Sequence, residues 1–339
     1  MKTREILASL PQLSALVVGD VCLDRWCYYE PQLAEPSRET SIPRVAVVEY
    51  ERTPGAAGTV AANLAALGVG RVAVLGVVGD DGHGFEMERA LGARNIEHSA
   101  LVRNQAGLTF TYTKLINRSN GIEDLARVDY LTVYELPEAV TSQIVERFEQ
   151  FAPEFDVVLV SDQMELGAGG VVGARLRDAI SRFAACHPKT VVFVDSRARG
   201  ELFRNVLVKL NEDEAAQACA RLEMKTDYEK LREHIGYRSL MVTHGPGGVM
   251  VIGANGVTLV PAKSVPSPVD ICGAGDSFSA GASLVLRLTG DAVEAARFGN
   301  LIASITIMKR GTGTASPDEV SAASERQDYE LLCELPATP

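Results

Sequence analysis

The segment with the clearest chemical meaning is a glycine-rich turn that leads into an aspartate, Asp270-Ile-Cys-Gly-Ala-Gly-Asp276-Ser-Phe-Ser-Ala-Gly-Ala. Gly273 and Gly275 allow the backbone to turn sharply and to approach a ligand closely. A helix that begins at about Ala274 would point its free N–H groups outward, and such a helix end binds anions. Asp276 lies in the first turn, where the helix dipole stabilises the ionised carboxylate.

A carboxylate beside an anion site is what phosphoryl transfer to an alcohol requires. Asp276 would accept the hydroxyl proton, while the amides of Gly273, Ala274 and Gly275 would take up charge on the transferred group. Taken alone, the segment also fits a plain turn in which Asp276 only starts the helix.

Three further aspartates directly follow apolar runs: Asp20 in LVVGD, Asp162 in VVLVSD and Asp195 in VVFVD. In an open parallel sheet, ligands bind beyond the carboxyl ends of the strands. Three acids at one edge indicate a polar, hydroxyl-rich or metal-bearing ligand, so we place Asp162 in a substrate site and Asp195 in a cofactor site. The alternative for each aspartate is that it caps the next helix or turn.

The elements that must position these residues follow from the hydrophobic pattern. Short β-branched runs, apolar on both faces, predict strands of a covered parallel sheet at residues 15–18, 72–78, 157–160, 191–194 and 240–242. Amphipathic stretches between them predict helices at residues 59–67, 84–94, 137–151, 171–187, 211–222 and 274–287. This alternation predicts a doubly wound α/β fold with helices on both faces of the sheet.

Two regions, residues 26–53 and 107–133, instead alternate between polar and apolar residues and predict strands with one solvated face. They would form a small β-sheet lid over the site. We expect a core of residues 1–21, 54–106 and 134–326, a lid of residues 22–53 and 107–133, and a frayed tail of residues 327–339. Lys114 and Arg127 in the lid could bind an anionic substrate, or only keep an edge strand soluble.

The composition narrows the class of partner. The 339 residues carry a net charge of -11, and 46% of them are hydrophobic, as in a soluble globular protein. With no block of Lys and Arg, neither nucleic acid nor an anionic membrane is an expected partner. No apolar run reaches the ~20 residues of a membrane span, the N-terminus is too polar for a signal peptide, and the six cysteines lack zinc spacing. We therefore expect a cytoplasmic protein.

Other glycine motifs do not fit their usual functions. No G-x-x-x-x-G-K-[ST] sequence occurs, so a P-loop is excluded. Gly68-Val-Gly-Arg-Val-Ala73 resembles a dinucleotide fingerprint, but it follows a predicted helix and leads into a strand, which is the wrong order. A nicotinamide-dependent dehydrogenase is therefore disfavoured.

Several motifs, taken in order, resemble the PfkB/ribokinase family of carbohydrate kinases. DICGAGDSFSAGA resembles the C-terminal signature, and residues 54–68 (PGAAGTVAANLAALG) resemble the N-terminal one. VVGDVCLD resembles the first strand, and Asn211-Glu-Asp-Glu214 the N-x-x-E motif. Residues 242–248 (VTHGPGG) and 311–314 (GTGT) resemble the nucleotide turn and the closing segment. The likeness runs from about residue 14 to 320.

The resemblance implies a role for each matching residue. Asp276 would be the base, and Gly273, Ala274 and Gly275 the anion hole. The acceptor would lie against the acid Asp24 and against four residues of the N-terminal signature, Gly55, Ala56, Thr59 and Asn63. The pattern described above adds Arg127 of the lid and Asp162 to this substrate site. Asn63 could equally bond its own helix or loop. ATP would lie against Asn211, Thr243, Gly245, Gly248 and Asn300, with Asp195 nearby. Mg²⁺ would be bound through water by Glu214, and a monovalent cation, with K⁺ as the candidate, by Asp270 and Ile271.

Within the family, the chain is similar to the kinase domain of the heptose-phosphate enzyme of ADP-heptose synthesis, as in VVGDVCLDRW and KRGTGTASPDEV. Where that branch reads PGGAAN, this chain reads PGAAGT, so Ala56 replaces a glycine and Thr59 replaces a longer-reaching asparagine. Gln163-Met-Glu-Leu-Gly167 stands where the branch has an aromatic residue and then lysine-glycine. These departures leave the transfer chemistry intact but bear on the substrate.

The sequence thus predicts an ATP- and Mg²⁺-dependent kinase that phosphorylates a hydroxyl of a sugar or sugar phosphate. The alternatives are the same chemistry on a nucleoside or a keto-deoxy sugar acid, or a catalytically silent regulator that binds sugar or nucleotide. The lid would exclude water on closing, and an exposed lid sheet would also allow two copies to pair as a homodimer.

Overall fold

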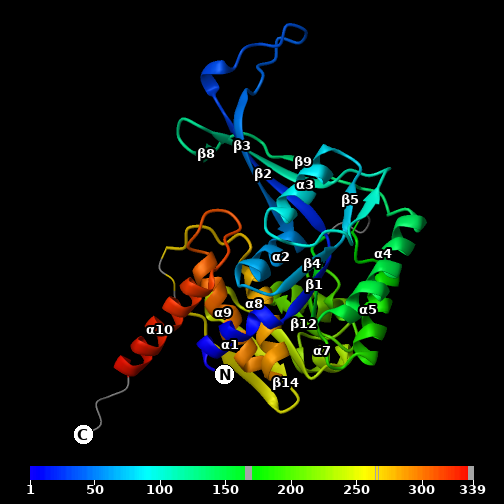
Figure 1. Ribbon diagram of the computed structural model, residues 1–339, viewed down its shortest axis with the longest axis vertical. Coiled ribbons are helices and arrows are strands. Elements are labelled where there is room, and N and C mark those ends of the chain that lie inside the picture. Colours follow the sequence, from blue (N-terminus) through cyan, green and yellow to red (C-terminus); the bar gives the residue numbers. More distant parts are fainter. Residues whose placement is uncertain (165–169, 264, 266, 335–339) are drawn as a thin grey trace.

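The core of the protein is an eight-stranded sheet, seen in a computed structural model that describes residues 1–164, 170–263, 265 and 267–334. The strands lie in the order β15-β14-β13-β12-β11-β10-β1-β4 (Figure 1). Their bounds are β1 Ser14–Gly19, β4 Arg71–Leu75, β10 Val157–Asp162, β11 Val191–Ser196, β12 Leu207–Asn211, β13 Ser239–Thr243, β14 Val249–Gly253 and β15 Gly256–Val260. The pairs from β4 to β13 are parallel, and β14 and β15 add an antiparallel edge.

Both faces of this sheet are buried, as its uninterrupted apolar runs predict. In β1, Ala15 and Val17 pack into one core, whereas Leu16 and Val18 pack into the other. The first core is covered by α1 Thr3–Ser9, α2 Ala57–Ala66, α8 Ala274–Thr289, α9 Ala292–Thr306 and α10 Pro317–Glu334. The second is covered by α4 Glu138–Phe151, α5 Ala174–Cys186, α6 Glu212–Arg221 and α7 Tyr228–Ile235. The predicted doubly wound α/β fold is confirmed.

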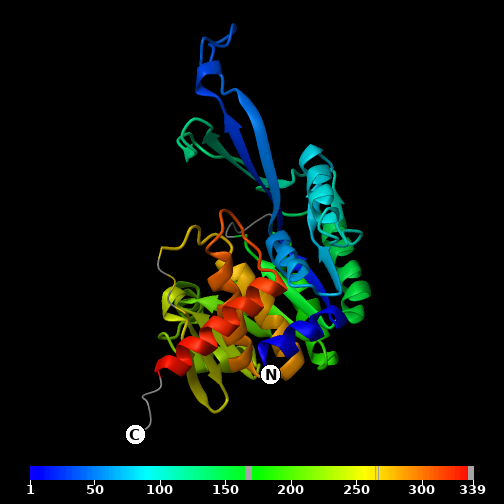
Figure 2. The ribbon, with the colours of Figure 1, turned by 60° about the vertical axis from the view of Figure 1, so that its left-hand side comes forward.

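A second sheet projects from the core as the predicted lid (Figures 1 and 2). Its strands are β2 Val21–Tyr29, β3 Val47–Ala56, β7 Phe110–Asn117, β8 Ile122–Glu123 and β9 Val128–Tyr130. Strand β2 follows β1 after a single residue, Asp20, so the chain passes directly from the core sheet into the lid. Helix α3 Gly82–Gly92 contacts the lid strands β2 and β3.

The structure differs from the predicted elements in several places, and helices α1, α7, α9 and α10 were not predicted. The run at residues 72–78 splits at Gly76 into β4 and the short strand β5 Val77–Gly79, which pairs with β6 Val102–Asn104 outside the main sheet. Strand β12 and the β14–β15 hairpin were not predicted. Helix α10 continues to Glu334, beyond residue 327 where a frayed tail was expected. Among the described residues, no helix is long and apolar enough to cross a lipid bilayer.

The side chain of Asp20, which follows β1, binds the backbone of the segment that follows β10. The buried carboxylate accepts three backbone hydrogen bonds of 2.8 Å, from Gln163 and Met164 on Oδ2 and from Val171 on Oδ1. Both ends of the connection between β10 and α5 are therefore tied to one side chain. Asp20 behaves as a residue that caps local backbone, the alternative stated for it above.

We predict that Asp20→Asn destabilises the fold. Both carboxylate oxygens of Asp20 accept backbone N–H groups, and the NH₂ group of asparagine would replace one of these acceptors with a donor. The free energy of unfolding should fall by about 1–3 kcal/mol, measured by urea denaturation at pH 7. Asp178→Asn, a substitution of an exposed aspartate on α5, is the matched control and should change it by less than about 0.5 kcal/mol. Equal stability of the two variants would contradict this role for Asp20.

Candidate active site

Two adjoining cavities open at the carboxyl edge of the core sheet. One, of about 530 Å³, lies between the lid and the core; the other, of about 670 Å³, lies between β11, β12, α6 and the start of α8. Five residues line both cavities: Gln163, Arg197, Cys272, Gly273 and Asp276. The structure therefore places Asp276, the predicted base, where the two cavities meet.

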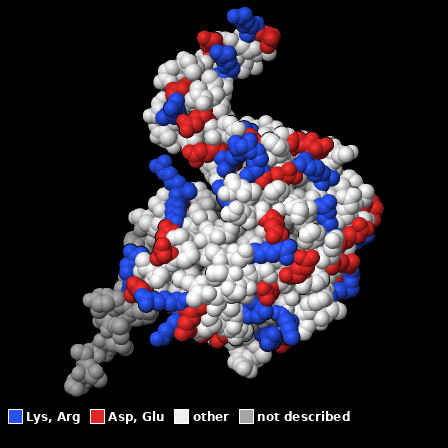
Figure 3. Space-filling model, in the orientation of Figure 1, with Lys and Arg blue, Asp and Glu red and all other residues white. Residues whose placement is uncertain are grey.

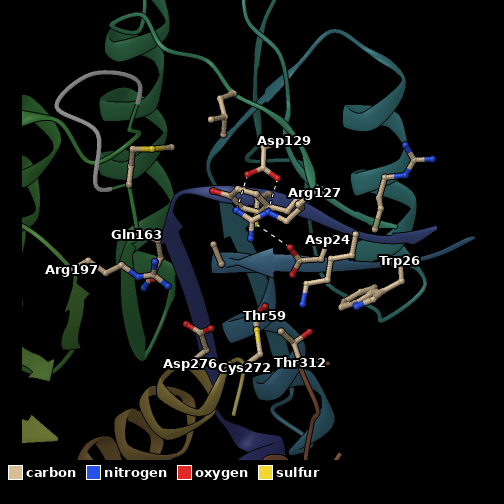
Figure 4. Close-up of a pocket in the computed structure, with 18 residues that line it drawn as sticks. Asp24, Trp26, Thr59, Arg127, Asp129, Gln163, Arg197, Cys272, Asp276 and Thr312 are labelled. Carbon is tan, nitrogen blue, oxygen red and sulfur yellow. Dashed lines mark hydrogen bonds and ion pairs between the residues drawn. The ribbon is translucent and has the colours of Figure 1, made fainter. Parts of the chain in front are cut away.

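Asp276 is the third residue of α8, and its carboxyl faces the space between core and lid (Figure 4). Removal from water, and after it the negative charge of Asp195, raise the pKa of Asp276, and the net result is a pKa of about 7. The cations of Lys209 and Arg197 act in the opposite direction. A carboxyl with a pKa near neutrality exchanges protons readily at physiological pH, as a general base must.

The turn before Asp276 has the backbone geometry that the two glycines suggest. Gly273 has φ = 77°, a left-handed conformation that favours glycine, and it directly precedes the first residue of α8. Ala274 N–H donates to the Ile271 carbonyl at 3.2 Å, so this amide is engaged within the turn. Gly273 and Gly275 both border the second cavity, at the positive end of the helix.

The second cavity contains a buried cation that the sequence reasoning missed. Lys209 lies on β12, and its ammonium Nζ contacts Asp195 Oδ2 at 2.8 Å. Burial lowers the pKa of Lys209, but Asp195 and Glu214 outweigh it, and the net shift is upward. A charged residue inside the apolar stretch VLVKL was the available signal, because a lysine is rarely buried without a partner.

Asn211 and Glu214 stand at the start of α6, on the wall of the same cavity. Asn211 Oδ1 accepts the Glu214 N–H at 2.8 Å, and Glu214 Oε2 accepts the Asn211 N–H at 2.7 Å, which is a capping box. Burial raises the pKa of Glu214. Within the described ranges, no three His, Cys, Asp or Glu side chains converge as a metal site, and Glu214 shares this cavity with Asp195, Asp213 and Asp276.

The first cavity is bounded by the lid on one side and the core on the other (Figure 4). Asp24 points into it from β2; burial raises the pKa of Asp24 to about 6, and the cations of Lys114 and Arg127 oppose that shift. Arg127 pairs with Asp129 through two hydrogen bonds of 2.8 and 2.7 Å and lies over the Tyr112 ring. The cavity thus offers both hydroxyl acceptors and cations to a ligand.

The altered N-terminal signature forms the core side of this cavity. Ala56 has φ = 51° and ψ = −119°, a conformation that favours glycine and strains an alanine. Gly55 passes so close to Asp24 that a Cβ there would lie 2.6 Å from Oδ2. The Thr59 hydroxyl donates to the Pro54 carbonyl at 3.2 Å, so its hydrogen points into the protein.

Three predicted substrate residues, Gly55, Asn63 and Asp162, are not among the described residues that line this cavity. Asn63 is fully buried and donates to the Thr59 carbonyl at 3.0 Å, which is the helix-bonding alternative. Asp162 is fully buried, pairs with Arg199 and accepts the Ser196 hydroxyl at 2.6 Å. Neither Asn63 nor Asp162 is among the described residues that line the second cavity. Their positions favour structural roles, because the side chain of Asn63 bonds its own helix and the carboxylate of Asp162 already bonds Arg199 and Ser196. Glu165 to Gly167, in the other departure from the heptose branch, lie outside the described residues.

The predicted nucleotide residues gather at the antiparallel edge of the sheet. Thr243 ends β13 and bonds the Leu210 carbonyl at 3.4 Å, and Gly245 has φ = 53° in the turn that follows. Gly248 has φ = 95°, and a Cβ there would lie 2.2 Å from the Val260 carbonyl oxygen. Asn300 on α9 donates to that same carbonyl at 3.3 Å. Gly248 and Asn300 therefore meet at the end of β15.

The predicted monovalent-cation residues join two distant segments. Asp270 accepts N–H groups from Cys272 at 2.9 Å and from Gly311 at 3.0 Å. The side chain of Ile271 is exposed, which leaves its backbone carbonyl as the group it could offer. The carboxylate thus links the turn before α8 to the closing G-x-x-T segment.

Comparison with known proteins identifies the family of the chain. Residues 12–319 match the pfkB family of carbohydrate kinases. The bifunctional protein HldE of Caulobacter sp. (strain K31) is 30% identical over 327 residues, which cover 93% of this chain and 64% of the relative. HldE of Coxiella burnetii is 29% identical, covering 91% of this chain and 63% of the relative. The chain thus spans a little under two thirds of the length of these curated relatives.

Solved structures show the same fold at low sequence identity. Escherichia coli phosphofructokinase-2 in complex with potassium superposes with a TM-score of 0.68 at 18% identity, covering 93% of this chain and 99% of that one. Arabidopsis thaliana ribokinase complexed with ribose and ATP has a TM-score of 0.65 at 17% identity, covering 92% and 99%. Because the family match extends over almost the whole chain, the protein belongs to the pfkB family of carbohydrate kinases.

Proposed function

We propose that this protein transfers the γ-phosphoryl group of ATP to a hydroxyl of a sugar or sugar phosphate, with Asp276 as the general base. The observation that carries the proposal is the position of Asp276 at the junction of two cavities. An acceptor in the lid-side cavity and a triphosphate in the other would bring the hydroxyl and the γ-phosphorus face to face beside one carboxylate. That is the arrangement an in-line transfer needs.

Each group then has one task in the transfer. Asp24 orients the acceptor by accepting hydrogen bonds from its hydroxyls. Asp276 takes the proton of the attacking hydroxyl as the oxygen–phosphorus bond forms and the bond to ADP breaks. The helix end at Gly273 and Gly275 stabilises charge on the transferred group, and the lid shields the site from water that would otherwise hydrolyse ATP.

The nucleotide would lie along the edge defined by Thr243, Gly245, Gly248 and Asn300, with its phosphates toward α6 and α8. The donor set near the phosphates fits Mg²⁺, because that ion keeps several waters and needs few protein carboxylates; Glu214 would hold it through water. The bound ion supplies charge neutralisation to the phosphates. Asp270 and Ile271 are the candidate K⁺ ligands, supported by the bridge from Asp270 to Gly311 and by the potassium bound in the E. coli neighbour.

The acceptor class follows from the charges of the lid-side cavity. Asp24 suits a polyhydroxylated ring, and the cations of Lys114, Arg127 and Arg197, which line the same cavity, suit an anionic substituent. A sugar phosphate satisfies both requirements. A keto-deoxy sugar acid would also satisfy them, and a nucleoside would use only the first.

A catalytically silent sugar- or nucleotide-binding regulator is the second candidate. The strained Ala56 and the inward-facing Thr59 hydroxyl favour it, because both lie where an active relative would contact the acceptor. The partly exposed Asp276 beside an anion site favours the kinase, since a regulator has no use for a base with a pKa near 7.

We propose that two copies of the chain pair through the lid. The outer lid carries exposed apolar side chains, among them Val47, Val48 and Tyr50, which would suit a homodimer through the lid. Acidic and basic side chains are interspersed over the face shown in Figure 3, a distribution better suited to small ligands than to nucleic acid or a membrane surface. A cytoplasmic location agrees with the supply of ATP.

We predict that Asp276→Asn abolishes turnover, a loss of about 10²–10⁴-fold or more, while the dissociation constant for ATP changes little. The amide keeps the shape of the side chain but cannot accept the proton. ADP formation and calorimetric ATP binding provide the two readouts, with Asp178→Asn as the matched control. Near-normal turnover in Asp276→Asn would remove Asp276 from the role of base.

We also predict that kcat rises tenfold per pH unit below about pH 7 and levels off above it. The base works only when ionised, and the pKa of Asp276 is raised to about 7. Initial rates between pH 5.5 and 8.5 at saturating substrates measure this. A flat profile down to pH 5.5 would mean that no group with this pKa limits the reaction.

The paired substitution Ala56→Gly and Thr59→Asn should shift substrate preference toward heptose phosphates, because it restores the residues of the heptose branch. Ala56→Gly alone should also raise the free energy of unfolding by about 1 kcal/mol, by removing the backbone strain. Ranked kcat/KM values over a sugar panel and urea denaturation measure the two effects. An unchanged ranking would show that these positions do not determine specificity.

A further inference from the structure

Lys209 is a buried cation at the wall of the phosphate-side cavity, and the mechanism above gives it no role. Its side chain is 7% exposed, and its ammonium contacts Asp195, whose side chain is 5% exposed. The same Asp195 oxygen also accepts the Ser279 hydroxyl at 2.8 Å. Asp195 therefore accepts a hydrogen bond from Ser279 of α8 and also forms the ion pair with Lys209.

The register of the sheet explains why these side chains meet. Asp195 on β11 lies directly opposite Lys209 on β12. Val208 and Leu210, the neighbours of Lys209, pack into the core that α6 and α7 cover. Because side chains alternate along a strand, Lys209 points to the other face, where α8 begins.

The ammonium lies against the turn that carries the predicted anion hole. A Cβ built on Gly275 would lie 3.1 Å from Lys209 Nζ, so a side chain at this position would crowd the cation. Lys209, Gly275 and Asp276 all line the same cavity. A fixed positive charge and the positive end of a helix therefore face one space.

A purely structural ion pair explains less of this arrangement. Removing a lysine from water is costly, and a buried pair rarely stabilises a fold more than apolar residues would. The pair here stands at a cavity wall beside Asp276, and the residue of the α8 turn next to the ammonium is a glycine, which leaves room for it. These features suit a cation that must reach a ligand.

We propose that Lys209 is a catalytic residue that binds the γ-phosphoryl group of ATP and takes up its negative charge during transfer. This inference rests on the proposed function. The bond from the γ-phosphorus to ADP breaks, the bond to the acceptor oxygen forms, and the acceptor proton goes to Asp276. Lys209 stays protonated throughout. Asp195 acts as a positioning residue that holds the ammonium over the first turn of α8.

The test compares ATP with ADP, because only ATP carries the γ-phosphoryl group. In Lys209→Met, calorimetry should show ATP binding weakened by about 10- to 100-fold, with ADP binding weakened far less. Lys209→Arg should recover part of the ATP affinity because it keeps the charge. Lys230→Met removes an exposed lysine on α7 and should leave both affinities unchanged.

Kinetics give a second readout. Lys209→Met should lower kcat by about 10²–10³-fold and move the acid limb of the pH profile to higher pH, since a cation that favours ionised Asp276 is lost. If this variant fails to fold, Gly275→Ala replaces it. The added methyl group would lie 3.1 Å from Nζ and should push the ammonium aside by a few tenths of an ångström, which should reduce ATP affinity more than ADP affinity.

The outcomes separate this inference from the proposed function. Equal weakening of ATP and ADP, or no weakening of either, in a folded Lys209→Met protein would overturn the role of Lys209 even if the wild type is an active kinase. Selective loss of ATP affinity would support it even if no acceptor is phosphorylated, and the kinase proposal alone would then fail.

Discussion

The chemistry of this protein depends on one constraint: a carboxylate must be kept partly out of water, next to the positive end of a helix, without being neutralised permanently. Asp276 meets that condition at the start of α8. Desolvation and Asp195 raise its pKa, while Lys209 and Arg197 lower it, and the balance lies at about 7. A stronger cation or a wetter site would make it a weaker base, and a drier site would keep it protonated.

The carboxyl edge of the parallel sheet supplies the charges that keep this balance. Its three strand-end aspartates have similar sequence contexts but different partners. Asp20 accepts backbone amides, Asp162 pairs with Arg199, and Asp195 pairs with Lys209. The first two fix the chain that borders the acceptor cavity, and only Asp195 reaches the phosphate-side cavity. This edge of the sheet thus both supports the chain around the acceptor cavity and supplies a charge that shifts the pKa of Asp276.

The parts of the fold that follow from local pattern could be predicted from the sequence. Apolar β-branched runs marked five core strands, and the glycine turn placed the start of α8 at Ala274. Strand β12 was missed because Lys209 interrupts its apolar run, and the β14–β15 hairpin because half of it is exposed. In each case long-range pairing, which a local pattern does not encode, decides the structure.

The candidate site could be predicted where a motif determines its own geometry, as at Gly273 and Asp276. It could not be predicted where partners from distant elements decide the role. Nothing near Asp162 in the sequence reveals Arg199 as its partner, and nothing near Asn63 reveals that its helix is fully buried. The strain at Ala56 likewise depends on a φ angle that is set by the junction of β3 and α2.

The most direct test of the account is ADP formation from ATP and Mg²⁺ across a panel of sugars, sugar phosphates, sugar acids and nucleosides. The account predicts that at least one sugar or sugar phosphate stimulates ADP formation well above the rate without acceptor, and that the product carries a new phosphate ester. No stimulation by any member of the panel, with ATP binding established by calorimetry, would contradict the assignment as a sugar-phosphorylating kinase.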